Sequence, residues 1–318
     1  IEPKYVVAAA QDVLQVAHKG AILAIEYTIS PGTIDKFVRP AIVANGKVIG
    51  DDIQIAHVPE RIIPGNMLYE LEHNSRTIGA DDKKVAEVLQ EVYGSFCKGN
   101  MIFTDVKTAE MAKVVENTFR DINIAFANEL AKMCNRAGMD VYEIIKVANM
   151  HPRVNILTPG PGVGGHCISV DPWFLVGDYP DIVNIIREAR IINDEMPEYV
   201  LSRVSAIMKE KNITDLSQVG FYGLTYKEDV DDTRESPTLQ LIECMERHLA
   251  FGARFYDPMV DDDIVENQYH DFDKFMDGIK LLVVMVGHSH LKEQKDALEN
   301  VTVYDTRHCV EARDLYRL

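Results

Sequence analysis

The hydrophobic periodicity of the sequence changes twice, and these changes constrain the fold more than any other feature. Up to about residue 105, short apolar runs alternate with helical patterns, and the same alternation returns after Thr214. Between them, apolar side chains recur at three- and four-residue steps from Met111 to Met133, and Gly138 can end the helix. Alternating strands and helices are typical of parallel sheets with crossover helices. We therefore predict an α/β protein whose two Rossmann-like parallel-sheet domains are joined by a long-helix central domain.

The predicted domains cover residues 1–105, 106–212 and 213–318. The strands expected in the two outer domains are 21–27, 53–58, 101–104, 219–224, 253–257, 281–286 and 301–304. The expected helices are 5–18, 33–43, 81–96, 107–138, 141–150, 181–211, 236–251 and 273–277. Long helices with wide apolar faces usually pack against a partner. A homodimer through the central helices is the expected assembly.

Charge and cysteine content narrow the functional classes. A formal net charge of -17 argues against broad binding to nucleic acid or to anionic membranes. Five scattered cysteines without CxxC or Cys/His metal spacing are typical of reduced thiols and of a cytoplasmic protein. No apolar run approaches the roughly 20 residues of a membrane span. The composition predicts a globular protein with no metal site.

A glycine-rich loop from Thr158 to Pro172 is the most specific segment. Four glycines in six positions allow unusual dihedral angles and close approach of the backbone to a ligand; they are Gly160, Gly162, Gly164 and Gly165. Cys167 follows them, and Asp171 comes four residues later. A thiolate there could attack an aldehyde, with Asp171 orienting a water. The alternative is a tight structural loop with an inert buried cysteine, and spacing alone does not separate the two.

Polar residues in the first two domains are weaker candidates. Lys113 and Asn117 are four apart and share a helix face, where they could hold an oxyanion, although an ordinary solvated face has the same pattern. Glu60 follows the strand at 53–58, at the strand end where open α/β sheets bind ligands, and is a candidate base. Thr28 lies in the polar turn after the preceding strand, and its hydroxyl could bind cofactor or water, or such a hydroxyl could cap the next helix.

Two basic residues stand near a predicted helix start in the last domain. Lys227 follows a strand, and Arg234 comes just before the helix expected at 236–251. Such an arrangement can bind phosphate, or the charges can pair with neighbouring aspartates in a surface loop. Composition does not decide between these two interpretations.

Taken in order, these segments resemble the UDP-glucose/UDP-N-acetylmannosamine dehydrogenase family over essentially the whole chain. The resemblance is carried by the motifs at 59–65 (PERIIPG), 108–117 (TAEMAKVVEN), 151–156 (HPRVNI) and 160–173 (GPGVGGHCISVDPW). It implies oxidation of a sugar C6 alcohol to a carboxylate with two NAD and one water, in a homodimer that serves surface polysaccharide synthesis.

The resemblance also implies roles for single residues. Cys167 would form a thiohemiacetal and then a thioester; the catalytic helpers would be Lys113, Asn117, Asp171 and Glu60. Substrate contacts would come from Gly164, Gly165, His166 and Lys227, and from Arg153, which would reach the substrate of the neighbouring subunit. Cofactor contacts would come from Thr28, Glu60 and Arg234.

Departures from the family pattern sharpen these expectations. Pro64 and Val170 replace a glutamate and a lysine of the UDP-glucose enzymes, which favours an N-acetylhexosamine substrate: UDP-N-acetyl-D-mannosamine, or alternatively UDP-N-acetylglucosamine. Nothing in the first hundred residues fits the GxGxxG turn of a dinucleotide site. We therefore expect the N-terminal domain to be incomplete, with its first mononucleotide-binding half missing, and NAD binding to be weak. Two further alternatives are a two-electron hydroxyacid dehydrogenase and a non-catalytic UDP-sugar-binding dimer.

Overall fold

The computed structural model describes residues 3–62 and 65–318, and the chain divides into two compact units. Unit 1 consists of the described residues up to Thr118 together with Asp171–Val183, and unit 2 consists of Phe119–Val170 and Asn184–Leu318. The long helix α5 (Val106–Ala137) contributes its first turns to unit 1 and the remainder to unit 2. The three domain boundaries expected from the sequence remain a prediction.

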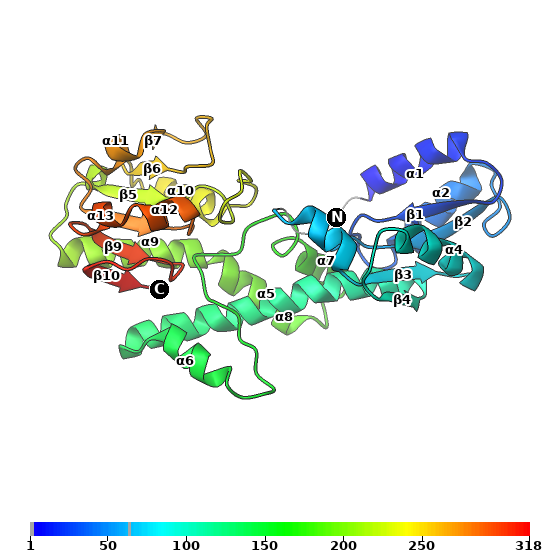
Figure 1. The fold of residues 1–318 in the computed structure, drawn as a ribbon, viewed down its shortest axis with the longest axis horizontal. Coiled ribbons are helices and arrows are strands. Elements are labelled where there is room, and N and C mark those ends of the chain that lie inside the picture. The colour runs from blue at the N-terminus through cyan, green and yellow to red at the C-terminus, as the bar shows by residue number, and fades with distance from the viewer. Residues whose placement is uncertain (1–2, 63–64) are drawn as a thin grey trace. The chain divides into compact units, whose positions relative to one another are not determined.

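Unit 1 contains a four-stranded sheet in the order β1-β2-β3-β4 (Figure 1). Its strands are β1 (Ala21–Ile25), β2 (Ile53–His57), β3 (Arg76–Ala80) and β4 (Met101–Thr104). Its helical elements are α1 (Lys4–Val16), the π-helix η1 (Ile34–Val38), α2 (Arg39–Ala44), α3 (Met67–His73), α4 (Lys83–Gly94) and α7 (Asp171–Asp178), besides the start of α5.

Side chains along β1 point alternately to the two faces of the unit 1 sheet, and each face is covered by helices. Leu23 and Ile25 pack in one cluster with side chains of α1, η1 and α2, whereas Ile22 and Ala24 pack against a second cluster that contains side chains of α4. Successive strand residues point to opposite faces, so the two clusters lie on opposite sides of the sheet. Unit 1 is thus a helix–sheet–helix sandwich, as the alternating pattern predicts.

One strand of unit 1, β3, was not predicted from the sequence. β1 and β2 are parallel, as are β3 and β4, but β3 runs antiparallel to β2 with His57 opposite Gly79. The sequence of β3, RTIGA, lacks the run of branched apolar residues that marks the other strands. Gly79 is needed because a Cβ there would lie 2.5 Å from that of Ala109, where α5 begins. This sheet is therefore mixed, not wholly parallel.

Unit 2 contains a six-stranded sheet in the order β10-β9-β8-β5-β6-β7, and all its described neighbouring strands are parallel. Its strands are β5 (Val219–Tyr222), β6 (Arg254–Tyr256), β7 (Gln268–Tyr269), β8 (Leu281–Val284), β9 (Thr302–Asp305) and β10 (Asp314–Arg317). Its helices are α6 (Val141–Ala148), α8 (Asn184–Asp194), α9 (Met196–Glu210), η2 (Leu216–Gln218, 3₁₀), α10 (Pro237–Arg247), α11 (Phe272–Met276), α12 (Ser289–Glu293) and α13 (Lys295–Leu298), besides the remainder of α5. The strand order reverses between β5 and β8, and open sheets of this kind bind ligands at such a switch point.

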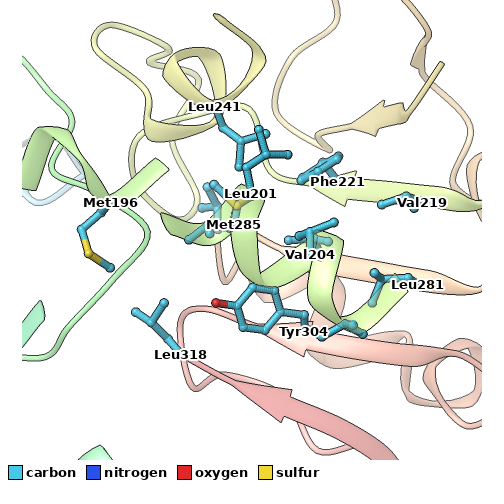
Figure 2. Packing of buried hydrophobic residues seen from close by; sticks show 14 of the residues in the cluster. Met196, Leu201, Val204, Val219, Phe221, Leu241, Leu281, Met285, Tyr304 and Leu318 are labelled. Atoms are coloured by element: carbon cyan, nitrogen blue, oxygen red, sulfur yellow. The ribbon is translucent and has the colours of Figure 1, made fainter. Parts of the chain in front are cut away.

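Both faces of the unit 2 sheet are covered. Figure 2 shows one face, where Leu201 and Val204 of α9 pack with Phe221 of β5 and Leu281 of β8. Tyr222 and Leu282, the next residues along the same two strands, belong to the cluster on the other face with α11, α12 and α13. The expected Rossmann-like sandwich is therefore present here.

Two helix boundaries differ from expectation for identifiable reasons. The helix expected at 181–211 is two helices, α8 and α9, separated at Glu195. Pro197 lies in the first turn of α9; it has no N–H and its ring clashes with a preceding turn, so one continuous helix cannot pass through it. The glycine-rich loop expected to extend to Pro172 ends earlier, because Asp171 already begins α7.

We predict that unit 1 loses stability in mild acid through His57. The ring is fully buried at the end of β2; burial lowers its pKa from 6.5 to about 4, while the Ile25 carbonyl acts weakly in the opposite direction. Between pH 6.5 and pH 4 the unfolded chain binds a proton at this histidine that the folded chain does not, so stability falls as the pH drops through this range. Between pH 7 and pH 4 the loss should be about 3 kcal/mol.

Urea unfolding followed by tryptophan fluorescence measures this effect, because the single tryptophan, Trp173, lies in unit 1. His57→Gln should flatten the pH dependence, whereas His18→Gln on the exposed surface should leave it unchanged. Equal pH dependence in all three proteins would contradict the prediction.

Candidate active site

The start of α5 and the start of α7 bring three of the expected catalytic residues together in unit 1. Lys113 and Asn117 lie on the same face of α5, and both are buried, as is Asp171. The Asn117 Nδ2 donates a hydrogen bond of 2.6 Å to the Asp171 Oδ2. Burial decides against an ordinary solvated helix face, since Lys and Asn are seldom buried without a polar role.

Glu60 and Thr28 lie at the carboxyl ends of β2 and β1. The Glu60 backbone N–H donates to the Glu26 carbonyl at 3.1 Å, which holds the two strand ends side by side. The Glu60 carboxylate is not an isolated base: Oε2 lies 3.1 Å from Arg76, and Oε1 accepts the backbone N–H of Arg61 at 2.6 Å. Thr28 is half-buried in the turn that follows β1.

Glu110 is a structural residue of this region that the sequence analysis missed. Its carboxylate is buried on α5 and accepts the backbone N–H groups of Gly32 and Ile34, the latter at 2.9 Å. Burial raises the pKa of Glu110, and these two hydrogen bonds oppose that effect. Glu110 thereby attaches the turn after β1 to the helix of Lys113. Its position three residues before Lys113, on the buried side of the helix, was the available signal.

In unit 2 the glycine-rich loop packs against the segment before α10. A Cβ on Gly164 would lie 2.5 Å from the Glu235 carbonyl oxygen and 2.7 Å from the Tyr226 Cβ. Gly165 has φ +85°, and its N–H donates to the Arg234 carbonyl at 3.1 Å. These glycines therefore permit close packing of the loop against Glu235 and Tyr226 of the protein itself. The ligand contact expected from the sequence stays a prediction.

The cysteine at the end of this loop is exposed. Cys167 is the exposed member of the five cysteines; Cys97, Cys134 and Cys244 are buried and Cys309 is half-buried. Its carbonyl accepts the N–H of Val170 at 3.1 Å, which forms a turn leading directly into α7. The charges of Cys167 and Arg234 are close enough for the thiolate to contribute to a raised Arg234 pKa, after the larger effect of Asp232. Exposure is typical of reactive thiols and not of inert core cysteines.

Arg234 also forms an ion pair within its own loop, which is the alternative to phosphate binding considered from the sequence. The guanidinium makes a two-pronged ion pair with Asp232, with Nε at 2.9 Å and Nη2 at 2.6 Å, and this bond lowers the Asp232 pKa. The start of α10 is capped by Ser236, and Pro237 contacts the glycine loop.

A buried Asp–His pair supports the loop of Lys227 at the switch point of the unit 2 sheet. The Asp257 Oδ2 accepts the N–H of Leu224 at 2.6 Å and of Thr225 at 3.0 Å, and His288 Nε2 lies 3.1 Å away. Burial acts to raise the Asp257 pKa, but the bonds from His288 and from the backbone outweigh it, so the pKa lies below its ordinary value. Neither residue was predicted, because each stands alone at the end of a strand in the sequence.

Three further predicted residues lie on loops of unit 2. Arg153 and His166 are exposed in unit 2, and Lys227 is half-buried. Pro64 lies outside the described residues. The structure thus groups Lys113, Asn117 and Asp171 within unit 1, and the glycine loop, Cys167 and Arg234 within unit 2.

We predict that Gly164→Ala destabilises unit 2 by about 1–3 kcal/mol, because the added methyl overlaps backbone that cannot move away easily. Urea unfolding followed by circular dichroism measures the change. Gly177→Ala is the control: it places the same methyl in open space on α7, and it should stabilise the protein by about 0.5–1 kcal/mol. A neutral Gly164→Ala variant would show that the loop is not held as described.

Comparison with known proteins identifies the family to which the chain belongs. Three models of the UDP-glucose/GDP-mannose dehydrogenase family match in order: its NAD binding domain over residues 1–97, its central domain over 107–195 and its UDP binding domain over 220–312. The UDP-N-acetyl-D-mannosamine dehydrogenase of Methanococcus vannielii is 41% identical over 312 residues, which is 95% of this chain and 70% of the relative. The chain belongs to the UDP-glucose/GDP-mannose dehydrogenase family.

Other members of the family are similarly close. The UDP-N-acetyl-D-mannosamine dehydrogenase of Methanococcus aeolicus is 43% identical over 296 residues. The solved UDP-D-ManNAc dehydrogenase of Pyrococcus horikoshii matches with a TM-score of 0.90 and 36% identity, over 99% of this chain and 77% of that one. The chain spans just under two thirds of the Methanococcus aeolicus relative, at 66% of its length.

Family membership identifies NAD as the cofactor and places the NAD binding domain within residues 1–97. That domain is therefore present, which corrects the expectation that half of it is missing. The observation that residues 1–97 contain no GxGxxG sequence is unchanged. The polar strand ends at Thr28 and Glu60 fit a ribose or nicotinamide, because hydroxyl and carboxylate groups meet there at the carboxyl edge of parallel strands. Within residues 3–62 and 65–318, no helix combines the length and apolar character needed to cross a bilayer.

Proposed function

We propose that the protein oxidises UDP-N-acetyl-D-mannosamine at C6 to the uronate, in two hydride transfers to NAD, with Cys167 as covalent nucleophile. The observation that carries the proposal is the exposed Cys167 thiol at the end of a loop fixed by Gly164 and Gly165. Cys167 precedes Asp171 by four positions in the sequence. Asp171 in turn bonds to Asn117.

The first step removes two electrons from the alcohol. The C6–H bond breaks with its electron pair, the hydroxyl proton leaves, and a C=O bond forms. NAD supplies the chemistry of accepting that hydride. Lys113 and Asn117 are suited to hold the C6 oxygen, because both are buried donors on one helix face and act in a site of low dielectric.

The second oxidation takes place on the substrate while it is bound covalently to the Cys167 sulfur. The Cys167 sulfur adds to the aldehyde carbon to give a thiohemiacetal, whose C6–H then leaves as a second hydride while the hydroxyl loses its proton, forming a thioester. Water adds to the thioester carbon and the sulfur leaves, regenerating the thiol and releasing the carboxylate. One alcohol, two NAD and one water thus give one carboxylate, two NADH and three protons. The covalent bond prevents loss of the aldehyde between the two steps.

Asp171 and Glu60 are proposed to orient the hydrolytic water and to accept its proton. Asp171 accepts from Asn117 through one oxygen, which orients its carboxylate. Glu60 is half-buried at a strand end where its bonds to Arg76 and to Arg61 fix its direction, and a carboxylate so held is suited to take a proton from water.

The substrate assignment rests on the UDP binding domain and on the relatives. The UDP binding domain at residues 220–312 supports a nucleotide-sugar substrate, and relatives about 40% identical are named UDP-N-acetyl-D-mannosamine dehydrogenases. Lys227, His166, Gly164 and Gly165 are proposed to contact the substrate, and Thr28, Glu60 and Arg234 the cofactor.

A homodimer through the central helices is part of the proposal. Phe119, Phe126 and Met133 recur at seven-residue steps on α5 and are all exposed, as are Val147 near the end of α6 and Met150 just after it. Side chains seven apart lie on one helix face, so these form an apolar stripe of the kind that packs against a second copy. Arg153, exposed on the loop that follows α6, is proposed to reach the partner's substrate.

Counting NADH per sugar tests this function. The protein should form two NADH for each UDP-N-acetyl-D-mannosamine consumed, and Glu60→Gln should accumulate the thioester on Cys167, seen as an added mass on the peptide that contains it. One NADH per sugar would indicate a two-electron dehydrogenase. Calorimetry that detects UDP but no NAD binding to the 318-residue chain would favour a non-catalytic UDP-sugar-binding dimer.

A further inference from the structure

Three asparagine side chains hold the irregular segment at residues 155–160 that leads into the glycine loop; we call Asn123, Asn128 and Asn149 the asparagine clamp. Asn149 exchanges two hydrogen bonds with the backbone of Ile156, at 2.8 and 2.9 Å. Asn123 bonds to the backbone on either side of Ile156, at 2.8 and 2.9 Å. A side-chain amide carries the same donor and acceptor as a peptide group, so the clamp replaces a neighbouring strand that this segment lacks.

The third member of the clamp is the end of a buried relay. The Gly160 N–H donates to the Asn128 Oδ1 at 2.9 Å, and the Asn128 Nδ2 donates to the Asn193 Oδ1 at 2.9 Å. The Asn193 Nδ2 donates to the Asp121 Oδ1 at 2.8 Å and to the Asp121 carbonyl at 3.0 Å. Asn128, Asn193 and Asp121 are all fully buried, and Arg190 pairs with Asp121 at 2.5 Å.

The two ends of this relay fix its direction. A peptide N–H can only donate, so Asn128 must present its oxygen to Gly160 and its NH₂ to Asn193. A carboxylate paired with a guanidinium accepts, so Asn193 must present its NH₂ to Asp121 and its oxygen to Asn128. Both amide orientations are thus determined, and neither amide can rotate by half a turn without leaving buried groups unpaired.

We infer that Asn128 is a positioning residue for Cys167, acting through the Gly160 N–H. In the described part of the chain, hydrogen bonds hold the loop at Gly160 through Asn128 and at Gly165 through the Arg234 carbonyl, and Cys167 follows Gly165 by two residues. Loss of the first attachment frees the glycine run to change its backbone angles, which moves the thiol. The catalytic significance of this positioning rests on the proposed function; the positioning itself does not.

Thiol reactivity and amide exchange test the inference without cofactor. In Asn128→Ala, exchange of the Gly160 amide should become about tenfold faster, because a buried hydrogen bond is lost, and the rate of Cys167 alkylation by iodoacetamide should change by roughly threefold or more. Cys167 is the exposed cysteine, so peptide mass analysis assigns the label. Asn149→Ala is the matched control: it removes two hydrogen bonds from the same clamp but should leave Cys167 alkylation within about twofold of the parent.

Unchanged Cys167 alkylation in Asn128→Ala, or an equal change in Asn149→Ala, would overturn the inference. Should Asn128→Ala fail to fold, Asn193→Ala interrupts the relay one residue further from the loop, and unchanged alkylation in that variant would overturn it equally.

Separate measurement of kcat and KM distinguishes a positioning role of Asn128 from a general loss of structure. In the active protein, Asn128→Ala should lower kcat by about tenfold while KM for the UDP-sugar stays within about threefold, because the variant displaces the nucleophile and not the UDP site. A larger rise in KM with unchanged kcat would contradict the assignment. If the parent oxidises no UDP-sugar at all, the proposed function fails, whereas alkylation and exchange still decide the inference.

Discussion

Cys167→Ala is expected to lower kcat for formation of the uronate by at least about a thousandfold, since removal of a covalent nucleophile abolishes the route that it opens. Without the sulfur, the first hydride transfer can still occur, so the variant should release aldehyde and form at most one NADH per sugar. The measurement is the initial rate of NADH formation together with chromatography of the UDP-sugar products.

Cys309→Ala is the matched control for this experiment. Cys309 is half-buried next to the Asp305 carboxylate; burial, followed by that negative charge, raises its thiol pKa to about 12, so it is not a nucleophile at neutral pH. Its removal should leave kcat unchanged. Full conversion to uronate by Cys167→Ala would eliminate the covalent mechanism and leave the two-electron dehydrogenase as the better description.

Arg190→Met is expected to destabilise unit 2 by about 3–5 kcal/mol, because it leaves the buried Asp121 carboxylate without its cation. Asp121 is fully buried, and burial already raises its pKa against the opposing effect of Arg190. A raised carboxyl pKa means that the unpaired group is more readily protonated, so the loss should be smaller in mild acid than at pH 8. Urea unfolding followed by circular dichroism at both pH values measures it.

Two further variants give this prediction its controls. Glu311→Ala removes an exposed partner of Arg317 in the same unit, and exposed pairs contribute little, so its effect should lie within the error of the measurement. The double variant Asp121→Leu/Arg190→Met replaces both charges by apolar groups and should recover part of the loss. A single variant as stable as the parent would show that the Arg190–Asp121 pair is not important for unit 2.

The parts of the fold that follow from local pattern were predictable. The alternation of apolar runs identified β1, β2 and β4 in unit 1 and most strands of unit 2, and the three- to four-residue period identified α5 almost to the residue. β3, β7 and β10 were not found, because RTIGA, QY and DLYR are short and mix charged or polar residues with apolar ones. Their place in a sheet depends on partners far away in the chain, which periodicity does not report.

The candidate site was predictable only where a motif carried it. Cys167, Lys113, Asn117 and Asp171 were identified through their resemblance to a family, whereas spacing alone left the thiol undecided. Their supports were missed: the asparagine clamp, Glu110 and the Asp257–His288 pair each join residues that are distant in the sequence. A lone buried Asn or Glu in a sequence does not indicate its partner, because such a group is satisfied only in the folded chain.

The packing of Gly164 and Gly165 has a consequence for how related sequences are interpreted. Their missing side chains make room for Tyr226 and for the backbone at Glu235. A relative that had lost its thiol would still need both glycines to fold this loop. The glycine run is therefore a marker of the fold of this loop, whereas under the proposed mechanism the cysteine beside it is the marker of activity.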